Sequence, residues 1–371
     1  MSNRIYPINT EQPWPRNQWW IAARADEVSR SPMERTILDE PIVLYRTEAG
    51  EPVAMAGLCP HRGYPMVHAR VVGDALECGY HGFTFGCEGQ CTRIPSQENV
   101  PPNWKIRTYP AVQRWEWIWI WTGDPALADT SKIPDLWCLG KPGWRSTVGR
   151  RATLEARYTL LIDNLFDLSH LNYIHVSLVG DQSAIVRTPV EMTQQPDGCF
   201  RLSRHVHDAP FGGYFAFQFP HKAAEAPRVY TEVFSIYYGP CLTLSGGPFF
   251  VEGGERLGES SFVHGMTPET RTTTHYWSAI TRDFRLDDDA FDAAMLANDA
   301  AVRDQDNEAL ALIERQAHRL DVLRELSAQQ DAGAIRVRRL LSAQIEAESR
   351  AASADWARGT TAVTLPGGRH A

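Results

Sequence analysis

Hydrophobic positions in the first third of the chain alternate with polar ones at the period of a β-strand. Two such runs, at 41–46 and 52–56, are separated by a turn that contains Gly50. A third run, from Trp115 to Trp121, has tryptophan at every second position. A period of two places successive side chains on opposite faces of a strand. We therefore predict an all-β region of short strands and turns from about residue 16 to residue 125.

The pattern changes twice after residue 125. The segment 122–135 is rich in turn-forming residues and predicts a domain boundary. Further β-type runs follow at 228–238 and 275–280, with one helical block around 158–176. After Asp287 the period becomes that of long helices, which reach to about residue 350. We predict an α+β fold with domains at 1–125 and 126–357, and a poorly ordered tail at 358–371.

Composition and charge exclude several classes of protein. The 371 residues are 43% hydrophobic, which is enough for a large core and two domains. A net charge of -8 argues against nucleic-acid binding. The most apolar stretch, Trp117 to Trp121, is far shorter than the ~18 residues of a membrane span, and no signal segment is visible. We expect a cytoplasmic protein whose seven cysteines serve metal binding or chemistry rather than disulfides.

Two loops in the first domain each offer one thiolate and one imidazole. Their candidate ligands are Cys59, His61, Cys78 and His81. A zinc finger usually groups its cysteines in one pair and its histidines in the other. Two mixed loops can instead give both thiolates to one iron and both imidazoles to a second, which is the ligand set of a Rieske 2Fe-2S cluster. We predict a Rieske cluster, with a structural zinc knuckle as the alternative.

A second polar constellation lies in the helical block. Asn164, Asp167 and His170 recur at intervals of three, which predicts that they share one face of a helix. Leucines border this row, so it is best explained if it faces a metal. His175 follows His170 by five positions, and such positions point about 140° apart in a regular α-helix. We therefore predict a helix end or a π-type turn between the two histidines.

Two histidines need a carboxylate to complete the facial triad of a non-haem Fe(II) oxygenase. The late helix offers Asp304 and Asp306. Asp306 lies on the apolar stripe that we predict for that helix from Phe291, Met295, Val302, Leu310 and Ile313. A buried carboxylate needs a partner, and a metal would supply one. We favour Asp306 as the third ligand of a mononuclear iron and keep Asp304 as the alternative.

Together these motifs resemble those of the Rieske non-haem iron oxygenases, in particular the oxygenase components of the vanillate O-demethylase and dicamba monooxygenase type. The resemblance spans roughly residues 16 to 316. It is carried by Cys-Pro-His-Arg-Gly (59–63), Cys-Gly-Tyr-His-Gly-Phe (78–83), Ile-Pro-Ser-Gln (94–97), Trp-Ile-Trp-Thr-Gly-Asp-Pro (119–125) and Asn-x-x-Asp-x-x-His-x4-His (164–175).

The resemblance implies a Rieske β-domain followed by a helix-grip (START-like) catalytic domain. It also implies a head-to-tail homotrimer, in which the cluster of one subunit supplies electrons to the mononuclear iron of its neighbour. Asp167 would then connect His170 to His81 of the partner subunit. In this family the acidic iron ligand usually lies in a Glu-Asp or Gln-Asp pair, which supports Asp306. The sequence departs from the family at Glu116, where glycine is common, and this position concerns the packing of the first domain.

The expected activity follows from the resemblance. It implies a terminal oxygenase that uses O₂ and electrons from a separate reductase, directly or through a ferredoxin, because the chain has no obvious flavin or nicotinamide motif. We expect monooxygenation of an aromatic compound, with O- or N-dealkylation and aldehyde release, and name Asp167 and Asn164 as catalytic. Ring cis-dihydroxylation stays open, because the metal ligands are the same. A Rieske electron carrier fused to a small-molecule-binding domain is the alternative from another class.

The substrate pocket is expected between the late sheet and the helices around 160–180. Five phenylalanines, at 211, 215, 217, 249 and 250, are candidates to line it, although aromatic residues at strand spacing are more often core. His264 has no partner at a ligand spacing, so we expect it to be structural.

Overall fold

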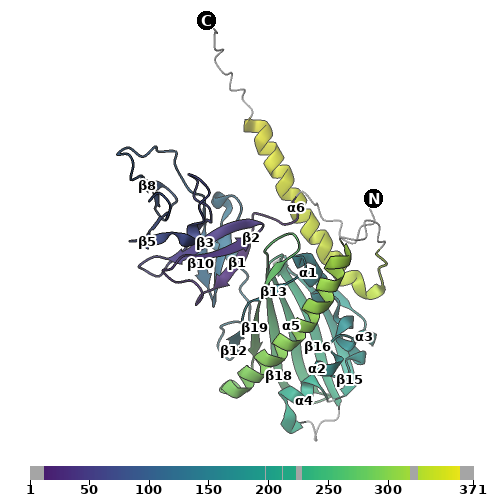
Figure 1. Cartoon of the computed structure of the whole chain (residues 1–371). Coiled ribbons are helices and arrows are strands. Elements are labelled where there is room, and N and C mark those ends of the chain that lie inside the picture. The colour runs from purple at the N-terminus through teal and green to yellow at the C-terminus, as the bar shows by residue number, and fades with distance from the viewer. Residues whose placement is uncertain (1–11, 197, 211, 223–227, 318–324, 360–371) are drawn as a thin grey trace.

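The computed structural model describes residues 12–196, 198–210, 212–222, 228–317 and 325–359, with side chains to residue 351. It confirms the α+β class: an all-β region is followed by a large antiparallel sheet with helices (Figure 1). No helix in the described ranges is long and apolar enough to cross a membrane. The division into 1–125 and 126–357 stays a prediction, and nearly all of the tail predicted at 358–371 lies outside the described residues.

The first region consists of three small antiparallel sheets. One has the order β1-β11-β10, the second β2-β3-β4-β9 and the third β5-β6-β7-β8. The strands are β1 (Trp19–Arg24), β2 (Met33–Ile37), β3 (Glu40–Arg46), β4 (Pro52–Ala56), β5 (Arg70–Val72), β6 (Ala75–Glu77), β7 (Thr84–Phe85), β8 (Cys91–Arg93), β9 (Thr108–Tyr109), β10 (Ala111–Arg114) and β11 (Trp117–Trp121). Short 3-10 segments occur at Met66–His68, Pro125–Leu127 and Thr130–Lys132.

The tryptophan-rich strand is shorter than predicted. It begins at Trp117, because Trp115 has a φ of +54° and forms a turn with Glu116. A left-handed residue cannot continue an extended strand. All five residues of β11 are buried, since β1 and β10 pair with its two edges and the core covers both faces.

The second region is built on one eight-stranded antiparallel sheet. Its order is β12-β19-β18-β17-β16-β15-β14, and β13 also pairs with β19. The strands are β12 (Arg145–Val148), β13 (Ala152–Leu154), β14 (Glu191–Gln194), β15 (Phe200–Pro210), β16 (Arg228–Gly239), β17 (Leu242–Val251), β18 (Arg256–Pro268) and β19 (Thr274–Arg282). These long strands confirm the predicted β-type runs and form the scaffold of the site described below.

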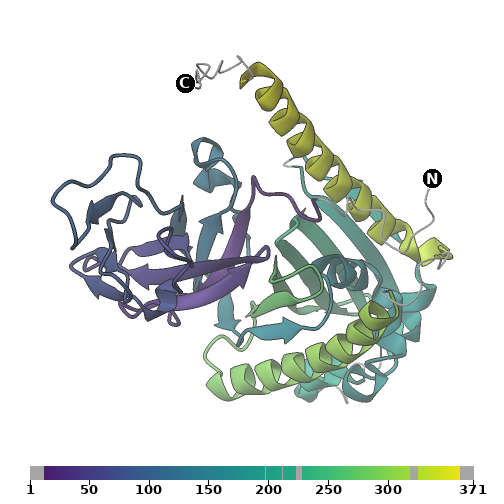
Figure 2. The same cartoon turned by 45° about the horizontal axis from the view of Figure 1, so that its top comes forward.

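Helices cover this sheet and extend beyond it (Figures 1 and 2). They are α1 (Tyr158–Phe166), η4 (Leu168–Asn172), α2 (Val176–Val179), α3 (Ser183–Arg187), α4 (Tyr214–Gln218), η5 (Pro220–Lys222), α5 (Asp289–Ala317), η6 (Gln329–Asp331) and α6 (Ala332–Gly359). The long helices predicted after Asp287 are present as α5 and α6. In both views α5 crosses the sheet, while α6 runs past it to the C-terminal end.

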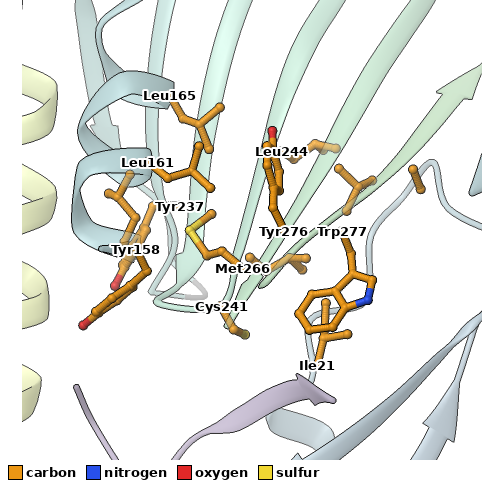
Figure 3. Packing of buried hydrophobic residues seen from close by; sticks show 14 of the residues in the cluster. Ile21, Tyr158, Leu161, Leu165, Tyr237, Cys241, Leu244, Met266, Tyr276 and Trp277 are labelled. Carbon is orange, nitrogen blue, oxygen red and sulfur yellow. The ribbon is translucent and has the colours of Figure 1, made fainter. Parts of the chain in front are cut away.

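The core continues from one region into the other (Figure 3). Leu161 and Leu165 of α1 point toward the large sheet, and Ile21 of β1 lies beside Trp277 of β19. Gly265 permits this close approach, because a Cβ there would lie 2.5 Å from Cδ1 of Ile21 and would force that side chain to move. The first region is therefore held against the large sheet by direct packing.

The buried face of α5 is more charged than its sequence predicts. Phe291, Met295 and Leu310 are buried as expected, but Ile313 is 43% exposed. The buried face instead includes Asp292, Asp299, Arg303, Asp306 and Glu314. Most of these charges have partners close in space but distant in sequence: Arg145 and Arg282 pair with Asp292, Ser278 donates to Asp299, and Arg157 pairs with Glu314. The predicted stripe was wrong at Ile313, because the partners of these charges lie on β12, on β19 and just before α1 and were not visible in the helix sequence.

Candidate metal centres and substrate pocket

The two cysteine loops share one backbone design. Cys59 N–H donates to the carbonyl of Tyr64 at 2.9 Å, and its own carbonyl accepts from Gly63 N–H at 2.8 Å. The same two bonds recur around Cys78, at 2.8 and 3.0 Å, with partners five and four residues later. Gly63 and Gly82 both have a left-handed φ, of +68° and +71°, which glycine adopts without strain. Each loop is thus closed by a glycine that turns the chain back under its cysteine.

These loops bring the four predicted cluster ligands together. Cys59 and Cys78 are each 2% exposed and neighbour one another as free thiols. The rings of His61 and His81 lie 4.7 Å apart on the exposed side. Burial, with the Cys78 thiol beside it, raises the pKa of Cys59 to about 11. Two thiolates side by side in the interior need a cation between them, so the donor set fits a cluster with its sulfur ligands inside and its imidazoles at the surface.

His170, His175 and Asp306 form a second group of donors. One ligand atom from each lies within 4.8 Å of the others, and no other such group of three occurs in the described part of the chain. Nε2 of His175 is 3.0 Å from Oδ1 of Asp306, and Nε2 of His170 is 3.7 Å from the same oxygen. His175 is fully buried and Asp306 is 6% exposed, whereas Asp304 is on the exposed side of α5. The structure therefore brings Asp306, and not Asp304, to the histidines.

The chain reaches this geometry through a break between the two histidines. His170 lies in the 3-10 segment η4, which ends at Asn172, and His175 directly precedes α2. The predicted break between His170 and His175 is present, because one helical segment ends between them and the next begins directly after His175. Burial lowers the pKa of His170, which keeps its ring neutral and its lone pair available to a metal.

The prediction that Asn164, Asp167 and His170 share one helical face was wrong. Helix α1 ends at Phe166, and Asp167 has φ and ψ of -116° and 89°, outside the helical region. Its carboxylate accepts from the backbone N–H of Ser169 at 3.0 Å and caps η4. Short-range spacing could not show that the helix stops one residue before Asp167.

Asn164 contacts the candidate iron ligand directly. Its Nδ2 donates to Oδ1 of Asp306 at 3.0 Å, while its own buried Oδ1 has no hydrogen-bond partner in the described structure. Oδ1 of Asp306 also faces Nε2 of His175. If that nitrogen carries a lone pair, two acceptors point at each other and need a cation between them, which is the arrangement that a metal site requires.

A cavity of about 190 Å³ opens beside these donors, between the helices and the large sheet. Its walls are mostly apolar, as is usual for small-molecule sites, and include Leu165, Leu168, Ile185, Val233, Phe262 and Val302. Of the predicted phenylalanines, Phe215 and Phe249 line it. Phe217 packs on Phe291 and Phe250 on Tyr230 instead, and residue 211 lies outside the described ranges.

The prediction of a merely structural His264 missed its place in the cavity wall. Its Nε2 lies 2.7 Å from Oγ of Ser245, and its Nδ1 lies 2.5 Å from the hydroxyl of Tyr276. Burial lowers the pKa of His264 to about 3, so the ring is neutral. The three groups carry three protons and make two bonds with each other, which leaves one hydroxyl proton for a ligand. Because the three residues of this row lie on three different strands, no sequence spacing could reveal it.

Two protein families match the chain. The Vanillate O-demethylase oxygenase C-terminal domain matches residues 154–347, which is more than half of the chain, and the Rieske [2Fe-2S] domain matches residues 18–110. The chain therefore contains a Rieske domain, as its cysteine loops predicted.

Curated relatives of similar length agree with these matches. The oxygenase component of dicamba O-demethylase from Stenotrophomonas maltophilia is 32% identical over 334 residues, which cover 87% of this chain and 96% of the relative. The vanillate O-demethylase oxygenase subunit of a Pseudomonas species is 31% identical over 365 residues, or 92% of this chain and 98% of the relative. An iron-sulfur subunit of the toluene-4-sulfonate monooxygenase system of Comamonas testosteroni is 35% identical over 291 residues, or 74% and 81%.

Solved structures show the same fold. Dicamba monooxygenase bound to dicamba superimposes with a TM-score of 0.80 at 31% identity, over 90% of this chain and 98% of the other. The same enzyme with non-haem iron and dicamba gives a TM-score of 0.76. These matches confirm the resemblance and the fold class. The chain belongs to the Rieske oxygenase family whose members include the oxygenase components of vanillate O-demethylase and dicamba O-demethylase.

Proposed function

We propose that this chain is the terminal oxygenase of a multicomponent system that monooxygenates an aromatic compound, with O- or N-dealkylation and release of an aldehyde. The observation that carries the proposal is the position of His170, His175 and Asp306 at the wall of a mostly apolar cavity. The relatives with dealkylating names support the same reaction class.

Two sets of residues would hold the metals. Cys59, Cys78, His61 and His81 would bind the Rieske cluster, and His170, His175 and Asp306 the mononuclear Fe(II). When bound, these groups supply electron storage and O₂ activation at an iron with open coordination positions. Asn164 would hold the Asp306 carboxylate in place through the bond from its Nδ2.

The cavity selects the substrate by size and polarity. An apolar cavity of about 150 Å³ in another protein binds benzene, so about 190 Å³ accommodates a single substituted ring. The apolar walls would exclude water and pack on the ring. In the row formed by Ser245, His264 and Tyr276, the one hydroxyl proton that is not used within the row would be donated to an acceptor group of the substrate. This hydrogen bond would orient the substrate ring.

Dealkylation then follows from hydroxylation of the carbon next to the ether oxygen or amine nitrogen. One oxygen atom of O₂ enters that C–H bond, and two electrons and two protons reduce the other atom to water. The resulting hemiacetal or hemiaminal collapses into an alcohol or amine and an aldehyde. The electrons would come from a separate reductase, directly or through a ferredoxin.

We also propose the head-to-tail homotrimer. In Figures 1 and 2 the sheet β5–β8, which frames the second cysteine loop, lies at the end of the first region away from the large sheet. Exposed apolar side chains flank both centres, Leu58 and Tyr80 beside the cluster loops and Tyr173 and Val176 beside His175. Burial of these side chains would stabilise association, and Asp167 would connect His170 to His81 of the partner subunit.

A cytoplasmic location belongs to the same proposal, because none of the seven cysteines is in a disulfide, as expected in a reducing compartment.

The test is turnover with a purified reductase and a panel of methoxy- and N-alkyl-substituted aromatic compounds. We expect substrate-dependent O₂ uptake with an equimolar aldehyde and dealkylated product. A cis-diol product would favour ring dihydroxylation. Reduction of the cluster without O₂ uptake for any substrate would favour the electron-carrier alternative.

A further inference from the structure

We infer that Gln305 is a positioning residue of the iron centre, which sets the tautomer and the donor strength of His175. The inference rests on the proposed function, since it assumes iron at His175. Oε1 of Gln305 lies 2.9 Å from Nδ1 of His175, and Oδ1 of Asp306 lies 3.0 Å from Nε2 of the same ring. Two consecutive residues of α5 therefore hold the two ring nitrogens of one fully buried histidine.

The amide of Gln305 presents its carbonyl oxygen to the ring. Its Oε1 faces Nδ1 of His175, and its Nε2 lies on the other side, 3.4 Å from Oγ of Ser177. A carbonyl oxygen only accepts hydrogen bonds, so Nδ1 of His175 must carry the ring proton. Nε2 then has its lone pair directed toward Asp306, where a metal ion would sit. Partners of this kind commonly fix the tautomer of ligating histidines.

The chemical nature of the side chain at position 305 also affects which oxidation state of iron the site stabilises. Nδ1 of His170 bonds the backbone carbonyl of Asp167, so both histidines donate to uncharged oxygens. A carboxylate at either position would draw the proton away from Nδ1 more strongly and make the ring a stronger donor. A stronger donor stabilises Fe(III) over Fe(II). Glutamine at 305 thus gives His175 an uncharged hydrogen-bond partner, so that the ring is a ligand of moderate strength and favours the ferrous state.

Titration of Fe(II) into protein that keeps its cluster but lacks the mononuclear iron tests this inference. We expect Gln305→Leu to weaken Fe(II) binding roughly 10- to 100-fold, the loss usual for such partners, with an unchanged cluster EPR spectrum. Gln305→Glu should restore the affinity and shift the reduction potential of the bound iron to a more negative value than in the unmodified protein. Asp304→Asn, on the exposed side of the same helix, is the matched control and should change neither quantity.

The outcomes separate this inference from the proposed function. Fe(II) affinity equal to that of the unmodified protein in Gln305→Leu, or an unshifted potential in Gln305→Glu, would overturn the role of Gln305 alone. If the unmodified protein binds no Fe(II) that depends on His170, the proposed function itself fails. If Gln305→Leu does not fold, the potential of Gln305→Glu still decides the inference.

Discussion

Asn164 and Asp306 are 142 residues apart in sequence and are joined by a 3.0 Å hydrogen bond, from Nδ2 to Oδ1. The bond connects α1 to α5 at the cavity wall. It is made to the oxygen that also faces both histidines. The two helices that flank the candidate iron site are therefore coupled through one carboxylate, whose orientation depends on groups from both.

Replacement of Asp306 by asparagine should remove the mononuclear iron. The amide is neutral and a weaker ligand, so we expect the protein to lose about one iron per chain and nearly all turnover. Iron analysis on the purified variant checks this. Asp304→Asn should keep iron and activity, because Asp304 is exposed and away from the histidines. The reverse result would reassign the third ligand.

Replacement of Cys78 by serine should destroy the cluster. Serine supplies no thiolate, so we expect loss of the Rieske EPR signal and of reductase-driven turnover. Cys87→Ser serves as the control, because the Cys87 thiol contacts the carbonyl of Asp74 at 3.2 Å and the hydroxyl of Tyr45 at 3.9 Å rather than a predicted cluster ligand. An intact signal in Cys78→Ser would contradict the ligand assignment.

Replacement of Asp167 by asparagine should separate electron delivery from metal binding. Asparagine can still accept from Ser169 and keep the cap on η4, but it carries no charge. We expect both metals to be retained while turnover falls, roughly 10- to 100-fold if Asp167 connects to His170 as proposed. Ser169→Ala loses only the bond from the Ser169 hydroxyl to the Asp167 carboxylate and keeps the backbone cap and the charge, so its turnover should stay close to normal. Equal losses in both variants would indicate a structural role only.

Replacement of His264 by leucine should weaken binding of substrates that carry a hydrogen-bond acceptor. The variant breaks the row with Ser245 and Tyr276 and leaves their hydroxyls without a partner. A lost bond of this kind costs about 1–3 kcal/mol, which corresponds to a KM roughly 5- to 150-fold higher. Steady-state kinetics with matched substrates, with and without the acceptor, measure this. An equal rise for both substrates would assign His264 to packing instead.

His275 should make stability depend on pH in the acid range. Its ring bonds the carbonyl of Thr36 at 2.8 Å and the guanidinium of Arg151 at 3.0 Å. Burial, with the charges of Arg35 and Arg151, lowers the pKa of His275 to about 3. In the unfolded chain the His275 ring binds a proton below about pH 6.5, whereas in the folded chain it stays neutral down to about pH 3. The free energy of unfolding should therefore decrease as the pH is lowered through that window, and this group contributes up to about 1.4 kcal/mol per pH unit.

Urea unfolding across that pH window checks the prediction. His275→Gln can keep a donor for Thr36 and an acceptor for Arg151 without titrating, so its stability should decline less steeply as the pH falls. Identical slopes for the variant and the unmodified protein would show that His275 contributes nothing to the acid sensitivity.

The parts of the site that the sequence could predict are those set by short-range spacing. Cys59 and Cys78 each lie in a loop with a histidine two or three residues away, so a candidate ligand set was visible before any fold was known. The break between His170 and His175 followed from helix geometry alone. Asp306 could be favoured because a carboxylate on a buried helix face needs a partner.

The parts that it could not predict depend on tertiary contacts. Asp167 was placed on a helix that in fact ends at Phe166. Acidic residues on the buried face of α5 form ion pairs with arginines on other segments. His264 forms hydrogen bonds with hydroxyls on the two neighbouring strands. Such pairings are set by which strands and helices become neighbours, which no local pattern encodes.

The most direct test of the whole account is the iron and acid-labile sulfide content of anaerobically purified protein, with an EPR spectrum after dithionite reduction. A Rieske cluster and a mononuclear site together predict about three irons and two sulfides per chain, with a Rieske-type signal. About two irons and two sulfides, with no uptake of added Fe(II), would contradict the oxygenase proposal and leave an electron carrier. Zinc in place of iron and sulfide would contradict both metal assignments.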